Sequence, residues 1–292
     1  VGNRNRNVLC IRKNFPKSFF YRLRKALTER ARLIFGEESA LPEALLLGME
    51  QPERVIFTGS CTEALNLAIL GTLHQGDEVL CSHAEHNAVM RPLHHLAQTG
   101  QIHLTVLSPD NFGSLQPHTL QAAIGPRTAL VVISHASNVT GVVQPTHRLG
   151  AVCKENGIPL LVDAAQTAGV LDVRLDVLNA DMVAMPGHKG LLGPQGVGLL
   201  ALGPGMEPLP LIRGGTGSSS ESLEQPDDLP DRYESGTLPL PAIAGLLQGI
   251  RFARKHQAEI HEYESYLNTR LRQGLSTLPG ITCLGHPDAP RV

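Results

Sequence analysis

The chain has 292 residues, of which 42% are hydrophobic and 18% are charged, and its formal net charge is −2. This composition is typical of a globular protein and excludes a disordered chain. Because no basic run follows the first 30 residues and no apolar run approaches ~18 residues, we expect no nucleic-acid surface and no membrane span.

Elements are predicted along the chain from its apolar periodicity. An amphipathic helix is expected at 22–35, within a divergent N-terminal segment that covers 1–35. Seven short apolar runs then predict strands at 54–58, 77–82, 102–108, 128–137, 159–166, 180–186 and 197–202. Helical spacing lies between them, at 62–73, 88–100, 115–125 and 146–157. Continuous apolar strands separated by helices predict an α/β fold with a mostly parallel sheet covered on both faces.

The second half of the chain changes character after the last predicted strand. Residues 203–241 are rich in Gly, Pro, Ser and acidic residues and predict a long irregular excursion that closes a large domain, 36–241. From residue 242 the pattern is helical, and GITCLG then resembles the first strand of a new unit. We therefore expect 242–292 to contain connecting helices and the start of a C-terminal domain, in a chain truncated at both ends.

The cysteines and histidines show no metal-binding spacing, so we predict no metal site. No CxxC pair and no HExxH occur. The five cysteines are Cys10, Cys61, Cys81, Cys153 and Cys283. Scattered cysteines are typical of reduced thiols, and the polar N-terminus lacks the apolar core of a signal peptide. These features favour a cytoplasmic protein.

The run GSCTEA follows the first predicted strand. In a parallel α/β sheet, ligands bind at the carboxyl ends of the strands. Gly59 and Ser60 allow a tight turn, and the helix that follows offers free backbone N–H groups at its positive end. That combination predicts an anion site, most simply for phosphate, with Thr62 adding a hydroxyl. An ordinary helix cap by Ser60 or Thr62 is the alternative interpretation.

Polar side chains follow the next strands as well. His86 could stack on a flat ring, cap a helix or lie at the surface, and Asn138 also falls at a strand end. Asp163 directly follows four apolar residues, so a buried carboxylate is expected, which needs a cationic partner or strong donors. Gln166 lies one helical turn later.

The run MPGHKG places Lys189 in a loop between two buried strands, next to His188. Such a lysine is either a snorkelling side chain or a chemical group. A phosphate site, a stacking imidazole, an acid for a ring nitrogen and a lysine together are what pyridoxal 5′-phosphate requires. The combination predicts that cofactor, although each element alone has a structural explanation.

The sequence resembles the class V aminotransferase superfamily, in particular its cysteine desulfurase-like group, which includes cysteine desulfurases and selenocysteine lyases. The matching runs are RVIFTGSCTEALNLAI, EHNAVMRPL, SHASNVTGVVQP, LLVDAAQTAGVLDVRLD, GHKGLLGPQGVGLL and RYESGTLPLPAIAGL. The resemblance implies a fold-type I transferase, with a seven-stranded sheet between helices and a small C-terminal domain.

The resemblance also implies how the cofactor ring is held. Lys189 would form the Schiff base, Asp163 would pair with the pyridine nitrogen, and Gln166 would reach the phenolic oxygen. His86 would stack on the ring and shuttle protons, and Asn138 would contact cofactor and substrate.

The phosphate and the subunit arrangement follow from the same resemblance. Cys61 and Thr62 would bind the phosphate through the helix start, with His188 alongside. Thr237 would reach the phosphate of the neighbouring subunit, which implies a homodimer with the long loop at its interface.

The implied activity is sulfur removal from L-cysteine, or the corresponding reaction of selenocysteine. L-cysteine would give L-alanine and enzyme-bound sulfur for an acceptor protein. Pro186 departs from the family pattern, which usually has a small or hydroxyl residue there, often a phosphate-binding serine. The nucleophilic cysteine and the carboxylate-binding arginine have no match in this chain and are expected beyond residue 292. Another class V aminotransferase or lyase activity, and a truncated non-catalytic protein, remain the alternatives.

Overall fold

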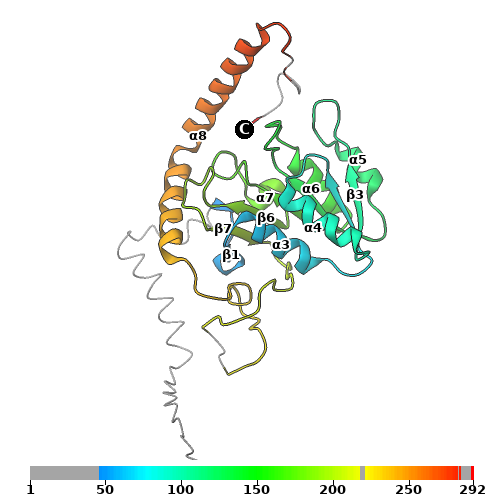
Figure 1. The fold of residues 1–292 in the computed structure, drawn as a ribbon, viewed down its shortest axis with the longest axis vertical. Helices are drawn as coiled ribbons and strands as arrows, with labels where there is room; N and C mark the ends of the chain where they lie inside the picture. The colour runs from blue at the N-terminus through cyan, green and yellow to red at the C-terminus, as the bar shows by residue number, and fades with distance from the viewer. Residues whose placement is uncertain (1–45, 218–220, 282, 284–290) are drawn as a thin grey trace, which may run out of the picture.

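The protein is described by a computed structural model that covers residues 46–217, 221–281, 283 and 291–292. The helix expected at 22–35 lies outside these residues. Figure 1 shows the sheet and its helices, with one long helix, α8, along the side of the domain.

All seven predicted strands are present. They are β1 Val55–Thr58, β2 Glu78–Ser82, β3 His103–Leu107, β4 Thr128–Ser134, β5 Leu160–Asp163, β6 Met182–Pro186 and β7 Gly198–Leu202. The helices are α3 Cys61–Thr72, α4 Asn87–Gln98, α5 Pro117–Ala123, α6 Thr146–Glu155, α7 Leu175–Leu178 and α8 Leu240–Ser276, with a 3₁₀ turn at Pro52–Arg54. The short helix α7 was not predicted, because four residues are too few to show a helical period.

The strands form one sheet in the order β1-β7-β6-β5-β4-β2-β3. Strands β3, β2, β4, β5 and β6 pair in parallel, whereas β7 runs antiparallel to both β6 and β1. The prediction of a mostly parallel sheet is therefore confirmed.

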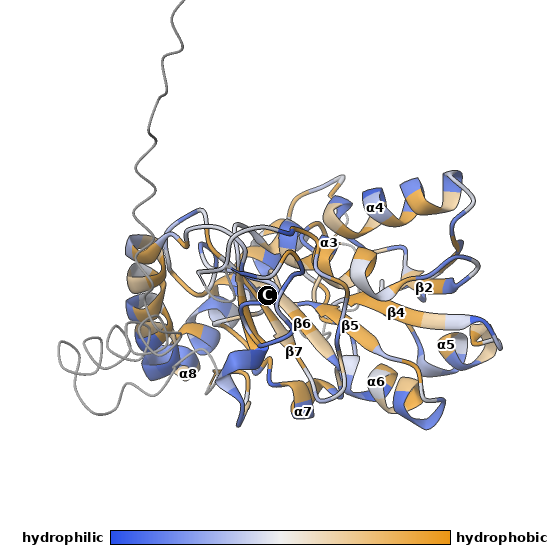
Figure 2. Cartoon of the chain, turned by 90° about the horizontal axis from the view of Figure 1, so that it is seen from below, coloured by the Kyte–Doolittle hydropathy of each residue, from blue (hydrophilic) through white to orange (hydrophobic). Residues whose placement is uncertain are grey.

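Helices cover both faces of this sheet, with α3 and α4 on one side and α5, α6 and α7 on the other (Figure 2). Because successive side chains of a strand point to opposite faces, each strand contributes to two cores. In β4, for example, Val132 packs with the helices α3 and α4, whereas Val131 and Ile133 pack with the opposite layer. Burial on both faces is the reason why these strands are continuously apolar.

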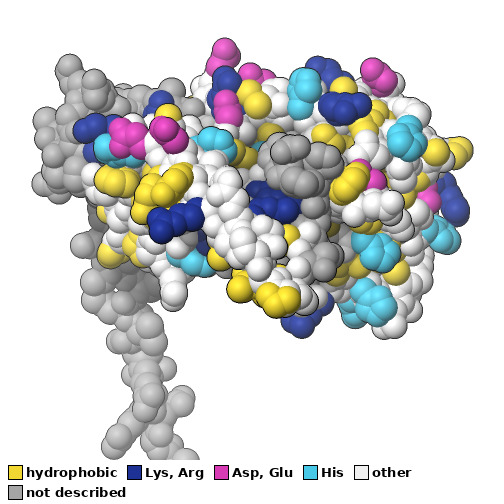
Figure 3. All heavy atoms as spheres, turned by 90° about the horizontal axis from the view of Figure 1, so that it is seen from above, with side chains coloured by type: hydrophobic (Ala, Val, Ile, Leu, Met, Phe, Trp, Pro, Cys, Tyr) yellow, Lys and Arg dark blue, Asp and Glu magenta, His cyan; other side chains and the backbone are white. Residues whose placement is uncertain are grey.

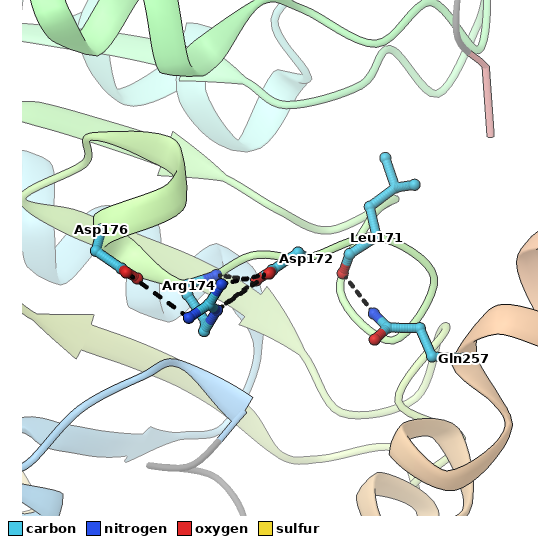
Figure 4. A network of polar contacts seen from close by, with 5 residues as sticks. All are labelled: Leu171, Asp172, Arg174, Asp176 and Gln257. Atoms are coloured by element: carbon cyan, nitrogen blue, oxygen red, sulfur yellow. Dashed lines mark hydrogen bonds and ion pairs between the residues drawn. The ribbon is translucent and has the colours of Figure 1, made fainter.

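The helix α8 is a single helix, where the sequence suggested several connecting helices. No proline follows Pro241 within it, so the helical ladder is not interrupted. Only its first part is buried, and Gln257 Nε2 donates to the carbonyl of Leu171 at 2.9 Å (Figure 4). Beyond that contact its apolar side chains Tyr263, Tyr266 and Leu271 are exposed. The strand expected at 280–285 is not present at Ile281 or Cys283, and its other residues lie largely outside those described.

The excursion predicted at 203–241 has no strand in its described residues, and helix enters it only at Leu240. Both of its ends are attached to the sheet. Arg54 donates to the carbonyls of Leu202, Gly203 and Met206 at 2.8–3.0 Å. At the far end, Glu234 accepts a hydrogen bond from the backbone N–H of Phe57 at 2.9 Å. The loop is therefore fixed where it leaves the domain and where it returns.

A glycine in β7 allows α3 to approach the sheet. A Cβ added at Gly198 would lie 2.4 Å from the carbonyl carbon of Ser60. We expect Gly198→Ala to lower the free energy of unfolding by about 1–3 kcal/mol, because the backbone of the helix start must move. Urea denaturation measures the change. The control Gly274→Ala places its methyl group in open space on α8. Equal midpoints for the two variants would contradict the packing argument.

Candidate functional site

A cavity of about 220 Å³ lies where the carboxyl ends of β4, β5 and β6 meet the starts of α3 and α4. Its wall contains eight of the nine residues predicted for the site. These are Cys61, Thr62, His86, Asn138, Asp163, Gln166, His188 and Lys189. Thr237, the ninth, is exposed and does not line the cavity. Residues separated by more than 100 positions in sequence are thus brought together at one edge of the sheet.

The start of α3 presents unpaired N–H groups to the cavity. Ser60 is the helix cap, since its hydroxyl accepts from the N–H of Glu63 at 3.1 Å. The carboxylate of Glu63 reaches back to the N–H of Gly59 at 2.8 Å. The N–H groups of Cys61 and Thr62 donate to no other residue in the described part of the chain. The cap and the anion site therefore coexist, and an anion has two N–H donors at the positive end of a 12-residue helix.

Asp163 is a buried acid on the cavity wall, with 5% of its surface exposed. Burial raises the pKa of its carboxyl, against the opposing effects of the Ala165 N–H and the Lys189 charge. Its Oδ1 accepts from the Ala165 N–H at 2.9 Å, and no ion pair joins it to another described residue. A buried carboxylate in this setting favours a cationic ligand group at the cavity.

The side chain of Cys61 faces the carboxyl group of Asp163. Its thiol lies 3.7 Å from Oδ1 of Asp163, and burial raises its pKa well above the ordinary value. The thiol therefore stays protonated and donates to the carboxylate. Any contribution of Cys61 to phosphate binding would come from its backbone N–H.

His86 caps a helix and is exposed, which are two of the roles considered for it, whereas stacking on a ring stays a prediction. Its Nδ1 accepts a hydrogen bond from the backbone N–H of Ala88 at 3.1 Å, so it caps α4. Because Nδ1 accepts, the proton of the neutral ring lies on Nε2. The ring also lines the cavity. The cap consequently fixes the imidazole at the cavity wall.

Lys189 lies in a tight turn that two glycines make possible. A Cβ added at Gly169 would meet the carbonyl of Gly190, and one added at Gly190 would meet the carbonyl of Ala168 at 2.4 Å. The carbonyl of Lys189 accepts from the N–H of Leu192 at 2.8 Å. The close approach of Gly169 and Gly190 holds the turn against the loop after β5, and this brings Lys189 near Asp163.

The amide side chains of Asn138 and Gln166 complete the wall. Neither makes a hydrogen bond to another described residue. Pro186 ends β6 and also lines the cavity, where it supplies neither a hydroxyl nor an N–H. The polar contacts on this side must therefore come from the two amides and from His188.

Sequence reasoning missed two residues of this region. Ser134 lines the cavity at the end of β4, and its hydroxyl donates to Glu85 at 2.7 Å. Glu85 also accepts from the hydroxyl of Ser82 at 2.6 Å. Burial raises the pKa of Glu85 to about 7. Its position directly before His86 was the available indication, but the partners come from two strands and could not be read from spacing.

The pKa of Glu85 predicts a pH-dependent stability. A carboxyl whose pKa rises from 4.5 to about 7 on folding holds its proton in the folded chain when the unfolded chain has lost it. Its contribution is therefore complete below pH 4.5 and is lost as the pH rises to about 7. With a discount for its partial exposure, we expect a loss on the order of 1–2 kcal/mol.

Urea denaturation between pH 4.5 and 8, for the parent chain and Glu85→Gln, measures this effect. The decline in the free energy of unfolding should be smaller in the variant. Parallel stability profiles would show that Glu85 keeps an ordinary pKa.

The cysteines, the helices and the charged surface of the described residues add no further group to the site. Cys61, Cys81, Cys153 and Cys283 form no disulfide. Among the described residues, no helix is both long and apolar enough to cross a membrane. Figure 3 shows one face of the molecule, on which basic, acidic and histidine side chains are interspersed.

Comparison with known proteins adds the evidence of ancestry. The family model for class-V aminotransferases matches residues 38–292. The chain belongs to the aminotransferase class-V family. A probable cysteine desulfurase of Methanothermobacter thermautotrophicus is 32% identical over 241 residues, which are 80% of this chain and 60% of that protein. This class-V chain thus spans about 60% of the length of that relative.

Solved structures agree with the fold of this class-V domain. The apo structure of cysteine desulfurase from Thermococcus onnurineus NA1 has a TM-score of 0.70 and 29% identity, covering 81% of this chain and 60% of that one. SspA in complex with cysteine has a TM-score of 0.65 and 32% identity, covering 79% and 62%.

Proposed function

We propose that this chain is the cofactor-binding part of a pyridoxal-phosphate-dependent enzyme of the cysteine desulfurase type. One observation carries the proposal: a single cavity contains an anion site at a helix start, a buried acid and a lysine. These are the three groups that the phosphate, the pyridine nitrogen and the aldehyde require. The cysteine desulfurase relatives and the cysteine complex of SspA support the choice of substrate.

The residues fit the cofactor group by group. The N–H groups of Cys61 and Thr62, with His188, would hold the phosphate, and Asp163 would pair with the ring nitrogen. Lys189 would bond covalently to the aldehyde. When bound, pyridoxal phosphate supplies an electron sink for a substrate carbanion. Asp163 supports that chemistry because a buried anion stabilises a proton on the ring nitrogen.

Two further residues would act on protons and position. His86 carries its ring proton on Nε2 while Nδ1 is held by the cap of α4, so it can stack on the ring and exchange a proton at Nε2. The amides of Asn138 and Gln166 bond to no other described residue, and Gln166 would donate to the phenolic oxygen. The wall would thereby offer a donor to the phenolic oxygen and an acceptor to the protonated ring nitrogen.

The three buried cysteines, Cys61, Cys81 and Cys153, are not assigned as the sulfur-accepting thiol. Burial raises the pKa of Cys81 and of Cys153 to about 12, and it also raises that of Cys61. Thiols that remain protonated are poor nucleophiles. This observation also favours a second candidate, a class-V aminotransferase or lyase that needs no cysteine.

A homodimer is part of the proposal. Thr237 is exposed and lies outside the cavity of its own chain, so it is free to reach a neighbouring one. The same loop exposes Leu209, Ile212 and Leu223, which a subunit interface would cover. A cytoplasmic location and a sulfur-acceptor protein as partner complete the proposed setting.

The test is the visible absorption of the purified chain with pyridoxal phosphate, before and after borohydride reduction. Peptide mapping then locates the label. A band whose reduced label maps to Lys189 supports the proposal, and assays with cysteine and selenocysteine on the full-length protein separate desulfuration from other class-V reactions. No band, or a label elsewhere, would overturn it.

A further inference from the structure

Glu85 lies behind the cavity wall, over the ends of two strands. Its Oε1 accepts from the hydroxyl of Ser82, the last residue of β2, at 2.6 Å. Its Oε2 accepts from the hydroxyl of Ser134, the last residue of β4, at 2.7 Å. The carboxyl group therefore bridges the carboxyl ends of neighbouring parallel strands, at the edge of the sheet where the cavity lies.

Two residues connect this carboxyl bridge to the proposed site. Ser134 lines the cavity and is the register partner of Asp163 on β5. His86 follows Glu85 directly in the chain, caps α4 and also lines the cavity. The two hydrogen bonds thus fix Glu85, the residue directly before His86. They also hold its carboxyl group one strand away from Asp163.

We propose that Glu85 is a positioning residue of this site, which fixes His86 at the cavity wall and adds a second carboxyl group beside Asp163. The inference rests on the proposed cofactor function. Glu85 would not touch the cofactor, and it acts through its two neighbours. As the pH rises, its negative charge would favour a proton on the lysine-bound nitrogen and on the ring nitrogen.

The groups around Glu85 support an electrostatic role. Burial raises the pKa of Glu85, and the charge of Asp163 on β5 raises it further. Burial and the charge of Glu85 both raise the pKa of Cys81 on β2. The neighbour on β4 is the neutral hydroxyl of Ser134, and α4 begins with His86. Among the described residues, Glu85 therefore has one carboxyl neighbour, Asp163, and no cation is bound to it.

The same strand contains a matched control. Glu78, the first residue of β2, accepts from the hydroxyls of Thr105 on β3 and Thr128 on β4, at 3.2 and 2.8 Å. It has the same type of bridge as Glu85, but at the amino end of the strands, opposite the cavity. A purely structural bridge would make Glu78→Gln and Glu85→Gln behave alike.

The experiment is a pH titration of the visible band of the pyridoxal-phosphate-loaded chain, for the parent, Glu85→Gln and Glu78→Gln. We expect the midpoint to fall by about 0.3–0.6 pH units in Glu85→Gln, because one negative charge about two strands from the ring is removed. The midpoint of Glu78→Gln should equal that of the parent. Ser134→Ala, which removes one donor to Glu85, should also shift the midpoint.

The outcomes separate this inference from the proposed function. A parent chain with the band on Lys189, and equal midpoints in both glutamine variants, would overturn the positioning role alone. A parent chain without the band would overturn both proposals. A shift confined to Glu85→Gln and Ser134→Ala, with all three variants folded, would support the inference.

Discussion

Lys189→Ala is expected to abolish the covalent cofactor link and to reduce catalysis by the full-length enzyme by roughly 10³-fold or more, because the reacting amine is no longer held in place. Lys189 is exposed and makes no side-chain hydrogen bond to the other described residues, so the fold should be unaffected. We expect the free energy of unfolding of the cofactor-free chain to change by less than about 0.5 kcal/mol.

The measurement is borohydride reduction followed by peptide mapping, with denaturation of the same samples. Lys154→Ala is the control, since that lysine is exposed on α6 and does not line the cavity. Its label should stay on Lys189. A reducible label that persists in Lys189→Ala at the peptide 185–190 would show that another group carries the cofactor.

Asp163→Asn is expected to leave the link on Lys189 intact and to lower kcat of the full-length enzyme by about 10²–10³-fold. The amide keeps the shape of the side chain but cannot stabilise a proton on the ring nitrogen. The cofactor-free variant should be at least as stable as the parent at neutral pH. Burial raises the pKa of Asp163, so the folded parent loses stability as the pH rises past the ordinary carboxyl range.

A half-buried carboxylate elsewhere in the sheet distinguishes the electrostatic effect from a structural one. Asp181 accepts from the N–H of Leu160 at 2.8 Å at the start of β5, remote from the cavity. Asp181→Asn should therefore lower stability and leave the spectrum of the bound cofactor unchanged. An Asp163→Asn enzyme with parental kcat would exclude the proposed pairing with the ring nitrogen.

The strands were predictable because parallel strands buried on both faces are continuously apolar. The antiparallel direction of β7 could not be predicted, because an apolar run such as 197–202 does not indicate the direction of its strand. The continuity of α8 was missed because Gly245 and Gly249 weaken a helix in isolation. In the fold, both glycines allow α8 to contact the loop after Lys189, where a Cβ at Gly249 would meet the carbonyl of Leu191.

Most of the site was predictable for a topological reason: the carboxyl ends of parallel strands share one edge. That rule placed His86, Asp163 and Lys189 together without any distance information. It could not show that the thiol of Cys61 faces Asp163, or that Glu85 bridges two strands, because both contacts depend on side-chain direction. Thr237 stays a prediction, since its partner would belong to another subunit.

The contact between α8 and the lysine loop has a mechanical consequence. A helix of 37 residues is roughly 55 Å long and behaves as a stiff lever. At its buried end, Gly249 lies against the backbone of residues 191–193, and the side chain of Leu246 packs on Gly187 and Gly193. The exposed end presents the apolar side chains of Tyr263 and Leu271 to a partner. A displacement of that end would be transmitted to the loop that follows Lys189. A partner that packs on the outer half of α8 would therefore act on the loop that follows Lys189.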